Sequence, residues 1–355
     1  MAESRRFSIA AMVAFTRDVL LAHGVPDADA ELAAKQMIEA DLTGFDAHGI
    51  VRLGNYCNWI KSGRVNAKAR IKVLQRSPAT ALVDGDDGIG HLVMTYAMNL
   101  AIELARESGV GWVGARNSNH AGAAGIYAEM PVAHGMVGIY AAVSTLNHMA
   151  PWGGAEALMG TNPIAVAIPA GQEAPVVLDI ATSVSSFGNI RQHVVTGEPL
   201  QEGWVVHSKT GEPILDPSKV EEGVLLPIGG HKGSGLALVI GLLAGVLNGA
   251  SFGRDVVDLA KPGKAPTNTG QFVVALDVSR FIAPEVFAAE MDRHLKDLAS
   301  SPRLPGFDSI RLPGADRRKR RADRGANGVQ LPSALVRQLD ALAAGLKLKP
   351  LAARS

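Results

Sequence analysis

The sequence Asp41-Leu42-Thr43-Gly44-Phe45-Asp46-Ala47-His48-Gly49-Ile50-Val51-Arg52 separates two apolar stretches that have helical spacing. Gly44 and Gly49 break the helical pattern around His48. Because imidazole gains or loses a proton near neutral pH, a histidine that points into a cleft at such a break suits acid–base chemistry. If a helix starts near Gly49, Arg52 lies about one turn from His48 on the same face. A guanidinium group in that place can clamp a carboxylate.

The same twelve residues also fit a plainer structure, a helix–turn–helix with a capping histidine and a surface arginine. On this stretch alone, that plainer structure is favoured. The other histidines do not indicate a metal centre, because none has the H-x-x-x-H or H-E-x-x-H spacing of a zinc site. The single cysteine, Cys57, excludes a disulfide framework and a cysteine-based zinc site. We therefore expect no bound metal, and a metal-dependent hydrolase is a weak competing class.

The composition is that of a globular chain. Its 355 residues suffice for a sizeable core and two or three subdomains, and 47% apolar with 19% charged residues excludes disorder. The net charge of +1 gives no overall attraction to nucleic acid or to an acidic membrane. The basic run Arg317–Arg321 is more typical of a solvated surface segment. Because the N-terminal residues lead into an amphipathic pattern, without an apolar signal core, we expect a cytoplasmic protein.

Helical and strand-like segments interleave without a strict β-α-β order, which favours an α/β fold with a mixed sheet over a purely doubly wound one. The first seventy residues look helical, with Ser8 as the N-cap of the first helix. Helices are expected at residues 7–23, 26–41, 51–62, 91–107, about 125–133, 284–298 and 336–346. Strands are expected at residues 79–84, 110–115, 137–143, 164–168, 176–180 and 272–276.

Two further segments are distinctive. Residues 192–226 are rich in glycine, proline and charge, and we expect an irregular excursion there. Leu236–Leu247 is strongly apolar, but it is shorter than the ~20 residues that a membrane span needs. We therefore expect a buried helix, in which Gly241 and Gly245 allow close packing against a sheet or a partner subunit.

Two polar segments are candidates for anion binding. Gly229–Gly235 contains His231 and Lys232 in a glycine-rich loop that enters a helix, where free backbone N–H groups and the helix dipole favour negative charge. A tight turn with a solvent-facing lysine explains it equally well. Asp179 and Thr182 end a predicted strand and can bind a ribose or pyrophosphate, or cap the next segment. No G-x-G-x-x-G run lies between a predicted strand and a predicted helix, so any dinucleotide is bound without the usual Rossmann motif.

Seven short motifs occur in a characteristic order: Asp46-Ala47-His48-Gly49 with Arg52, Asn117-Ser118-Asn119-His120, Pro151-Trp152-Gly153, Gly160-Thr161-Asn162-Pro163, Leu178-Asp179-Ile180-Ala181-Thr182-Ser183, His231-Lys232-Gly233-Ser234-Gly235 and Arg311-Leu312-Pro313-Gly314. With them the chain resembles the malate/L-lactate dehydrogenase family of the second, non-Rossmann type. That family includes ureidoglycolate, sulfolactate, 2,3-diketogulonate and piperideine-2-carboxylate enzymes. The resemblance runs from about residue 7 to about residue 345.

The resemblance implies an α/β fold with a mixed, largely antiparallel sheet of that family's type. It implies an N-terminal helical region at 1–75, a cofactor- and substrate-binding α/β domain at 76–310, and a helical C-terminal segment at 311–355. This last segment returns to the cofactor site and packs on the helical region. The implied cofactor is NAD or NADP, the implied substrate a small 2-oxo or 2-hydroxy acid, and the implied assembly a homodimer. A reductase of cyclic imino acids and a catalytically impaired dinucleotide-binding relative are the alternatives.

By position in this family, His48 matches the proton donor, Arg52 the carboxylate clamp and Thr161 a substrate-contacting residue. In some relatives the histidine that matches His120 is the acid–base group instead. The residues that match cofactor-contacting stretches are His120, Ser144, Asp179, Ile180, Ala181, Thr182, His231, Lys232, Gly314, Ala315 and Asp316.

Two positions depart from the family's pattern. Ala47 stands where the family usually has serine, and Asn189 stands where some members have aspartate. A proton relay between those two side chains is therefore changed at both ends, and water can serve as the proton route instead.

Overall fold

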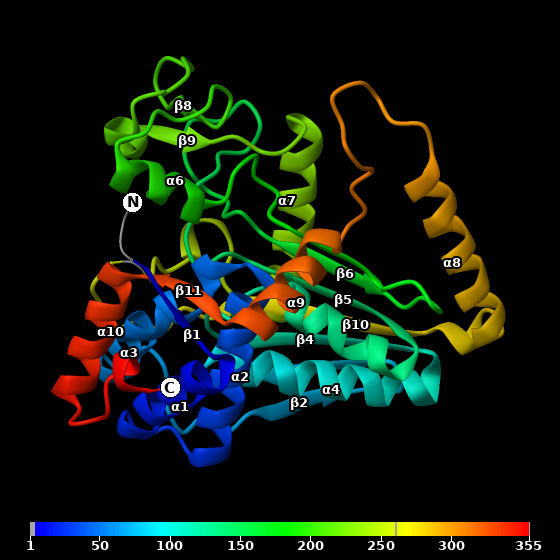
Figure 1. The fold of residues 1–355 in the computed structure, drawn as a ribbon, viewed down its shortest axis with the longest axis horizontal. Coiled ribbons are helices and arrows are strands. Elements are labelled where there is room, and N and C mark those ends of the chain that lie inside the picture. The colour runs from blue at the N-terminus through cyan, green and yellow to red at the C-terminus, as the bar shows by residue number, and fades with distance from the viewer. Residues whose placement is uncertain (1–3, 260, 355) are drawn as a thin grey trace.

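The computed structural model describes residues 4–259 and 261–354, and a seven-stranded sheet lies at its centre (Figure 1). The strand order is β2-β3-β4-β10-β5-β6-β7, and within the described residues β3 and β4 are the one parallel pair in this sheet. The mixed, largely antiparallel sheet that the family resemblance implies is thus confirmed. The strands are β1 (Ser4–Phe7), β2 (Lys72–Arg76), β3 (Thr80–Asp84), β4 (Val110–Ser118), β5 (Met136–Ala142), β6 (Ile164–Ile168), β7 (Val176–Ile180), β8 (Val205–His207), β9 (Gly223–Leu225), β10 (Thr269–Asp277) and β11 (Val329–Pro332).

Helices cover both faces of this sheet and form a separate layer at one end (Figure 1). They are α1 (Ile9–Ala22), α2 (Asp27–Thr43), α3 (Leu53–Lys61), α4 (Gly90–Ser108), α5 (Gly125–Glu129), α6 (Phe187–Thr196), α7 (His231–Ala244), α8 (Pro284–Ser300), α9 (Ala315–Asn327) and α10 (Ser333–Gly345). The central strand β10 shows why both faces are covered, because its side chains alternate between two cores. Val273 and Ala275 pack with α4, whereas Phe272 and Val274 pack on the α7 side.

The two ends of the chain share one core. Strand β1 pairs antiparallel with β11, and the apolar residues of α1, α2, α3 and α10 form a single buried cluster. Ser8 caps α1 as predicted, because its hydroxyl accepts the Ala11 N–H at 3.2 Å. The helical layer that carries residues 41–52 is therefore built from both ends of the sequence.

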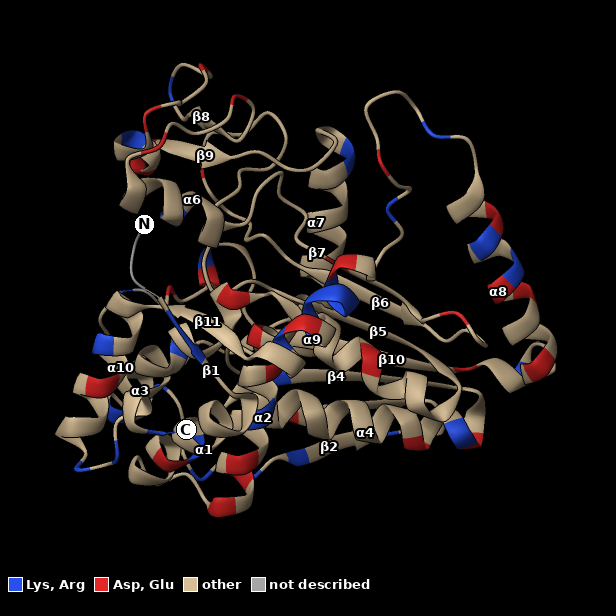
Figure 2. Cartoon of the chain, in the orientation of Figure 1, with Lys and Arg blue, Asp and Glu red and all other residues tan. Residues whose placement is uncertain are grey.

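The apolar helix differs from its prediction. It begins at His231, so residues 231–235 form its first turn and are not a loop, and only one of its faces is buried. Gly241 packs against Phe252 on the sheet side, while Val239 is 51% and Leu242 42% exposed. Figure 2 shows almost no charge along α7. By length and composition His231–Asn248 could cross a membrane, a test that core helices of soluble proteins also pass.

Two other expectations need correction. Residues 192–226 are not wholly irregular, because α6 extends to Thr196 and the short strands β8 and β9 pair antiparallel. Strand β2 has no counterpart in the prediction. Helix α6 has one buried residue, Ile190, and every residue of β2 is exposed. Strand β2, with the sequence Lys72-Val73-Leu74-Gln75-Arg76, also lacks the alternation of apolar and polar residues by which a half-buried strand is predicted.

The break around His48 consists of two single 3₁₀ turns, Asp46–His48 and Ile50–Arg52. Gly44 ends α2 in the left-handed region with φ 87°. The buried Asp41 side chain accepts the Ile50 N–H at 2.7 Å and so ties the second turn back to α2. A Cβ atom at Gly49 would overlap the Asp41 carboxyl group, so only glycine leaves room for this hydrogen bond.

We expect Gly49→Ala to lower the free energy of unfolding by about 1–3 kcal/mol, because the added methyl group must displace the Asp41 carboxyl group. Denaturant unfolding of the purified variant measures this loss. Gly54→Ala is the matched control, because a Cβ atom at Gly54 meets nothing within 4 Å and the position lies inside α3. Equal stability of the two variants would contradict the role given to Gly49.

Candidate active site

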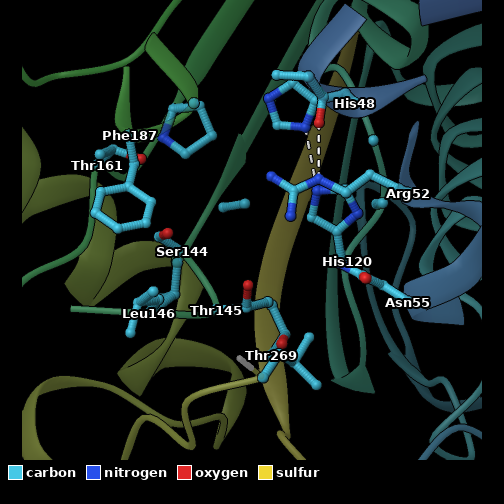
Figure 3. A pocket seen from close by; sticks show the side chains of 18 of the residues that line it. His48, Arg52, Asn55, His120, Ser144, Thr145, Leu146, Thr161, Phe187 and Thr269 are labelled. Atoms are coloured by element: carbon cyan, nitrogen blue, oxygen red, sulfur yellow. Dashed lines mark hydrogen bonds between the residues drawn. The ribbon is translucent and has the colours of Figure 1, made fainter. Parts of the chain in front are cut away.

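A cavity of about 680 Å³ lies between the helical layer, the sheet and α6. Its size is that of a site for a small molecule or cofactor. Side chains from distant parts of the sequence meet on its wall, as Figure 3 shows for several of them. Of the residues predicted for the site, those that line it are His48, Arg52, His120, Ser144, Thr161, Asp179 and Ala181.

His48 and His120 form a pair on this wall. Their rings stack with centroids 5.3 Å apart, and His48 Nδ1 lies 3.1 Å from His120 Nε2 (Figure 3). Burial, with a smaller contribution from Arg52, lowers the pKa of His48 to about 4. Burial also holds the pKa of His120 well below its usual value. Both imidazoles are therefore neutral at pH 7, and one of them donates the hydrogen bond that joins the pair.

Arg52 lies beside this pair. Its Nε donates to the Ala47 carbonyl oxygen at 2.7 Å, which fixes the base of the guanidinium group. Figure 3 shows its two terminal nitrogens extending into the cavity. Among the described residues, no hydrogen bond or ion pair engages those terminal nitrogens. A carboxylate in the cavity can therefore bind them in the paired geometry that guanidinium favours.

Asp179, at the end of β7, belongs to a buried charge cluster. It accepts the Gly125 N–H at 2.7 Å, and Arg317 Nη1 lies 3.9 Å from its carboxylate. Burial is the largest cause that raises the pKa of Asp179, to about 6. Arg317 is itself buried and pairs with Glu129 at 2.5 Å. The prediction that the basic run is solvated is therefore wrong for Arg317. The other basic residues of the run lie along α9, where Figure 2 shows them in blue.

The hydroxyl residues on the wall are held by a buried amide. Asn162 accepts the Ser144 N–H at 3.1 Å and donates to the Ala237 carbonyl oxygen at 2.9 Å. The buried Thr182 hydroxyl donates to the Thr161 carbonyl oxygen at 3.0 Å. Thr182 thus holds the wall together, whereas the Ser144 and Thr161 side chains stay at the cavity.

Other predicted cofactor residues lie outside this cavity. Ile180 is next to Asp179 but does not line the wall. His231 and Lys232 are exposed in the first turn of α7, where the His231 ring lies 6.3 Å from that of Trp152. Gly314, Ala315 and Asp316 lie where α9 begins, beside β7, whose Val177 N–H donates to the Pro313 carbonyl oxygen at 3.3 Å. Their roles toward a cofactor stay predictions.

Several residues that line the cavity are not among those predicted from the sequence. His148 and Phe187 stack with ring centroids 3.6 Å apart, and Arg191 and Lys261 add positive charge to the wall. Counted over the described residues, the lining has four basic side chains, since Arg52 and Arg64 also face the cavity, and one carboxylate, that of Asp179. The cavity therefore fits anionic ligands. Among the described residues, no group of three side chains is arranged to hold a metal ion.

Comparison with known proteins agrees with this architecture. The family model described as malate/L-lactate dehydrogenase matches residues 7–340. A malate dehydrogenase from Pyrococcus abyssi is 39% identical over 311 residues, 85% of this chain and 84% of that protein. An L-sulfolactate dehydrogenase from Methanocaldococcus jannaschii is 39% identical over 91% of this chain and 92% of its own length.

Solved structures agree as well. The sulfolactate dehydrogenase structure from Methanocaldococcus jannaschii aligns with a TM-score of 0.90 at 37% identity and covers 97% of this chain and 98% of that one. The relatives are named as dehydrogenases of small hydroxy acids, and the match extends over nearly the whole chain. This protein is therefore a dehydrogenase and belongs to the malate/L-lactate dehydrogenase family.

Proposed function

We propose that this protein transfers a hydride between the nicotinamide of NAD or NADP and C2 of a small 2-oxo or 2-hydroxy acid. His48 would exchange the proton and Arg52 would clamp the carboxylate. The observation that carries this proposal is the placement of a neutral imidazole and an unpaired guanidinium fork side by side on one cationic cavity wall.

His48 and Arg52 have different roles in the proposed reaction. Oxidation of a 2-hydroxy acid removes a proton from the hydroxyl group as the hydride leaves C2, and a neutral imidazole accepts that proton. In the reverse direction the imidazolium returns it to the carbonyl oxygen. Arg52 holds the carboxylate, which fixes C2 in the cavity, and such positioning lowers the entropic part of the barrier.

The polar and charged groups that line the cavity suit a dinucleotide. Ser144, Thr145 and Thr161 offer hydroxyl groups, and the excess of basic side chains offsets the charge of a pyrophosphate. When bound, the nicotinamide supplies or accepts the hydride. Relatives are named as NAD(+)-dependent and as NADP(+)-dependent enzymes, so both cofactors belong in the test.

Arg191 favours a substrate with a second anionic group. It lines the same cavity from α6 and lies close enough to Arg52 to lower the pKa of that guanidinium group through charge repulsion, although burial is the larger cause. Two neighbouring cations suit a dicarboxylate or a sulfonated acid better than a monocarboxylate. Oxaloacetate, the oxidised form of malate, therefore heads the list of substrates, and a cyclic imino acid stands lower.

We propose further that two copies of the chain associate through α7. Its exposed side includes Leu236, Leu238, Val239 and Leu242, and the short 3₁₀ turn that follows it adds Val246 and Leu247. Apolar surface of this kind is typical of interfaces. Light scattering after gel filtration should give twice the chain mass, and Val239→Glu should shift it toward one chain mass by burying a charge in the interface. A single chain mass for the unmodified protein would refute the dimer.

We expect the purified protein to oxidise NADH or NADPH in the presence of 2-oxo acids, followed by absorbance, and to prefer oxaloacetate to pyruvate. His48→Ala should lower kcat by at least ~100-fold and leave cofactor binding nearly intact, because it removes only the proton donor. The control is His294→Ala, an exposed histidine on the projecting helix α8 (Figure 1). A fully active His48→Ala enzyme would remove His48 from the proposed role. Absence of cofactor binding would refute the function.

We also expect oxidation of the hydroxy acid to continue at mildly acidic pH. Because the pKa of His48 is lowered to about 4, the basic imidazole persists far below the usual value of 6.5. For oxidation of the hydroxy acid, kcat/KM should stay level from pH 7 to about 5 and fall as pH drops through about 4, since it reports the free enzyme. Circular dichroism in the same buffers checks folding. A fall centred near pH 6.5 would assign the base to another group.

A further inference from the structure

Behind the His48–His120 pair lies a third buried group, the phenol of Tyr56 on α3. Its hydroxyl oxygen is 2.7 Å from His120 Nδ1, 2.8 Å from the His120 carbonyl oxygen and 3.3 Å from His91 Nδ1. Tyr56 and His91 are fully buried and neither lines the cavity. The proposed function therefore gives neither of them a direct contact with substrate.

The hydrogens in this cluster can be assigned by counting donors and acceptors. A carbonyl oxygen only accepts, so the single Tyr56 hydroxyl proton goes to the His120 carbonyl oxygen. Two lone pairs remain on the phenol oxygen, and the groups that face them are the Nδ1 atoms of His120 and His91. Both nitrogens must then carry their hydrogens. Burial raises the pKa of Tyr56 well above 10, so the phenol keeps its own proton.

His91 agrees with this assignment. Its Nε2 has no hydrogen-bond partner among the described residues and faces Gly122. With the hydrogen on Nδ1, this nitrogen is a bare acceptor, and a buried acceptor without a partner is better tolerated than a buried donor without one.

The assignment extends to the cavity. With its hydrogen on Nδ1, neutral His120 presents a bare Nε2 to His48, so His48 Nδ1 must donate across the 3.1 Å contact. The other nitrogen of His48, Nε2, is then unprotonated, and Figure 3 shows it directed away from His120. It is the free lone pair that a base needs.

We propose that Tyr56 is a positioning residue for the proton transfer. It holds His120 and, through it, His48 in the Nδ1–H tautomer, so that His48 Nε2 takes the substrate's hydroxyl proton. The inference rests on the proposed function. In the step, the substrate O–H bond breaks and an Nε2–H bond forms on His48. The C2–H electron pair leaves as hydride to the nicotinamide, and the carbonyl forms. His48 Nδ1–H stays bonded to His120 throughout.

The two positions of the family's proton relay, Ala47 and Asn189, offer no substitute for the contact between Tyr56 and His120. Ala47 has no hydrogen-bonding side chain, and the Asn189 amide donates to the Ser185 hydroxyl at 3.1 Å. The serine–aspartate relay that the family resemblance describes has therefore lost both of its side chains at these positions, as the sequence indicates. Orientation of His48 comes from the His120–Tyr56 side instead.

Tyr56→Phe tests the proposal, because phenylalanine keeps the ring and removes the hydroxyl that sets the tautomer. We expect kcat for hydroxy-acid oxidation to fall about tenfold or more, with less than a threefold change in KM. The solvent deuterium isotope effect on kcat should rise, because proton transfer becomes slower than the other steps. A purely structural role would move neither the isotope effect nor the split between kcat and KM.

Tyr127→Phe is the matched control. Tyr127 is also fully buried, and its hydroxyl donates to the neighbouring Ala121 carbonyl oxygen at 2.5 Å, but no hydrogen bond joins it to an imidazole. Its kcat should stay within twofold of that of the unmodified enzyme. If both variants show the same kcat and the same isotope effect, Tyr56 does not act on the proton transfer.

A second measurement reads the tautomers directly and does not depend on catalytic activity. Nitrogen-15 NMR of the histidine-labelled protein reads each ring nitrogen, and His48→Gln and His120→Gln assign the signals. Both His48 and His120 should be neutral with the hydrogen on Nδ1. A hydrogen on Nε2 of either would overturn the proposal. The spectrum is recorded without substrate, so it tests the tautomers independently of the proposed function. Absence of turnover with every acid would count against the proposed function instead.

Discussion

The candidate site depends on one buried hydrogen bond, from the Ile50 N–H to the Asp41 carboxyl group. Burial raises the pKa of Asp41 to about 8, while the hydrogen bond from Ile50 works in the opposite direction by favouring the charged carboxylate. The bond ties two short 3₁₀ turns to the end of α2, and those turns carry His48 and Arg52. Gly49 is the residue whose small size makes the approach feasible.

The sheet supplies the other half of the site. The loop after β4 brings His120, the loop after β5 brings Ser144, and Asp179 near the end of β7 lies beside Arg317. Because β1 pairs with β11 and the terminal helices share one core, both ends of the chain hold the helical layer together, and α2 of this layer packs on α4. The 3.1 Å contact between His48 and His120 lies where these two halves meet. Small shifts between the layers would therefore act directly on the pair to which we assign the proton transfer.

How far the sequence predicts this structure depends on whether the signal is local. The strands at 164–168 and 176–180 were predicted to the residue, because each is a short apolar run with polar or turn residues on both sides. The pair of His48 and Arg52 was predicted from one turn of spacing and the family's motifs. Helix α6 and strand β2 were missed because almost none of their residues is buried. The exposed face of α7 was missed because an apolar run does not say what covers it.

Tyr56 shows what local patterns cannot reveal. It follows Arg52 by four residues and, by sequence, is an ordinary aromatic residue of a helix core. Its partner His120 is 64 residues away, and only packing of α3 against the loop after β4 brings the two together. The tautomer of the base is then set by a chain of hydrogen bonds in which each group has one proton to place. Since Ala47 and Asn189 remove the alternative on the other side of His48, the orientation of the proton-transfer group depends on a residue that touches neither substrate nor cavity.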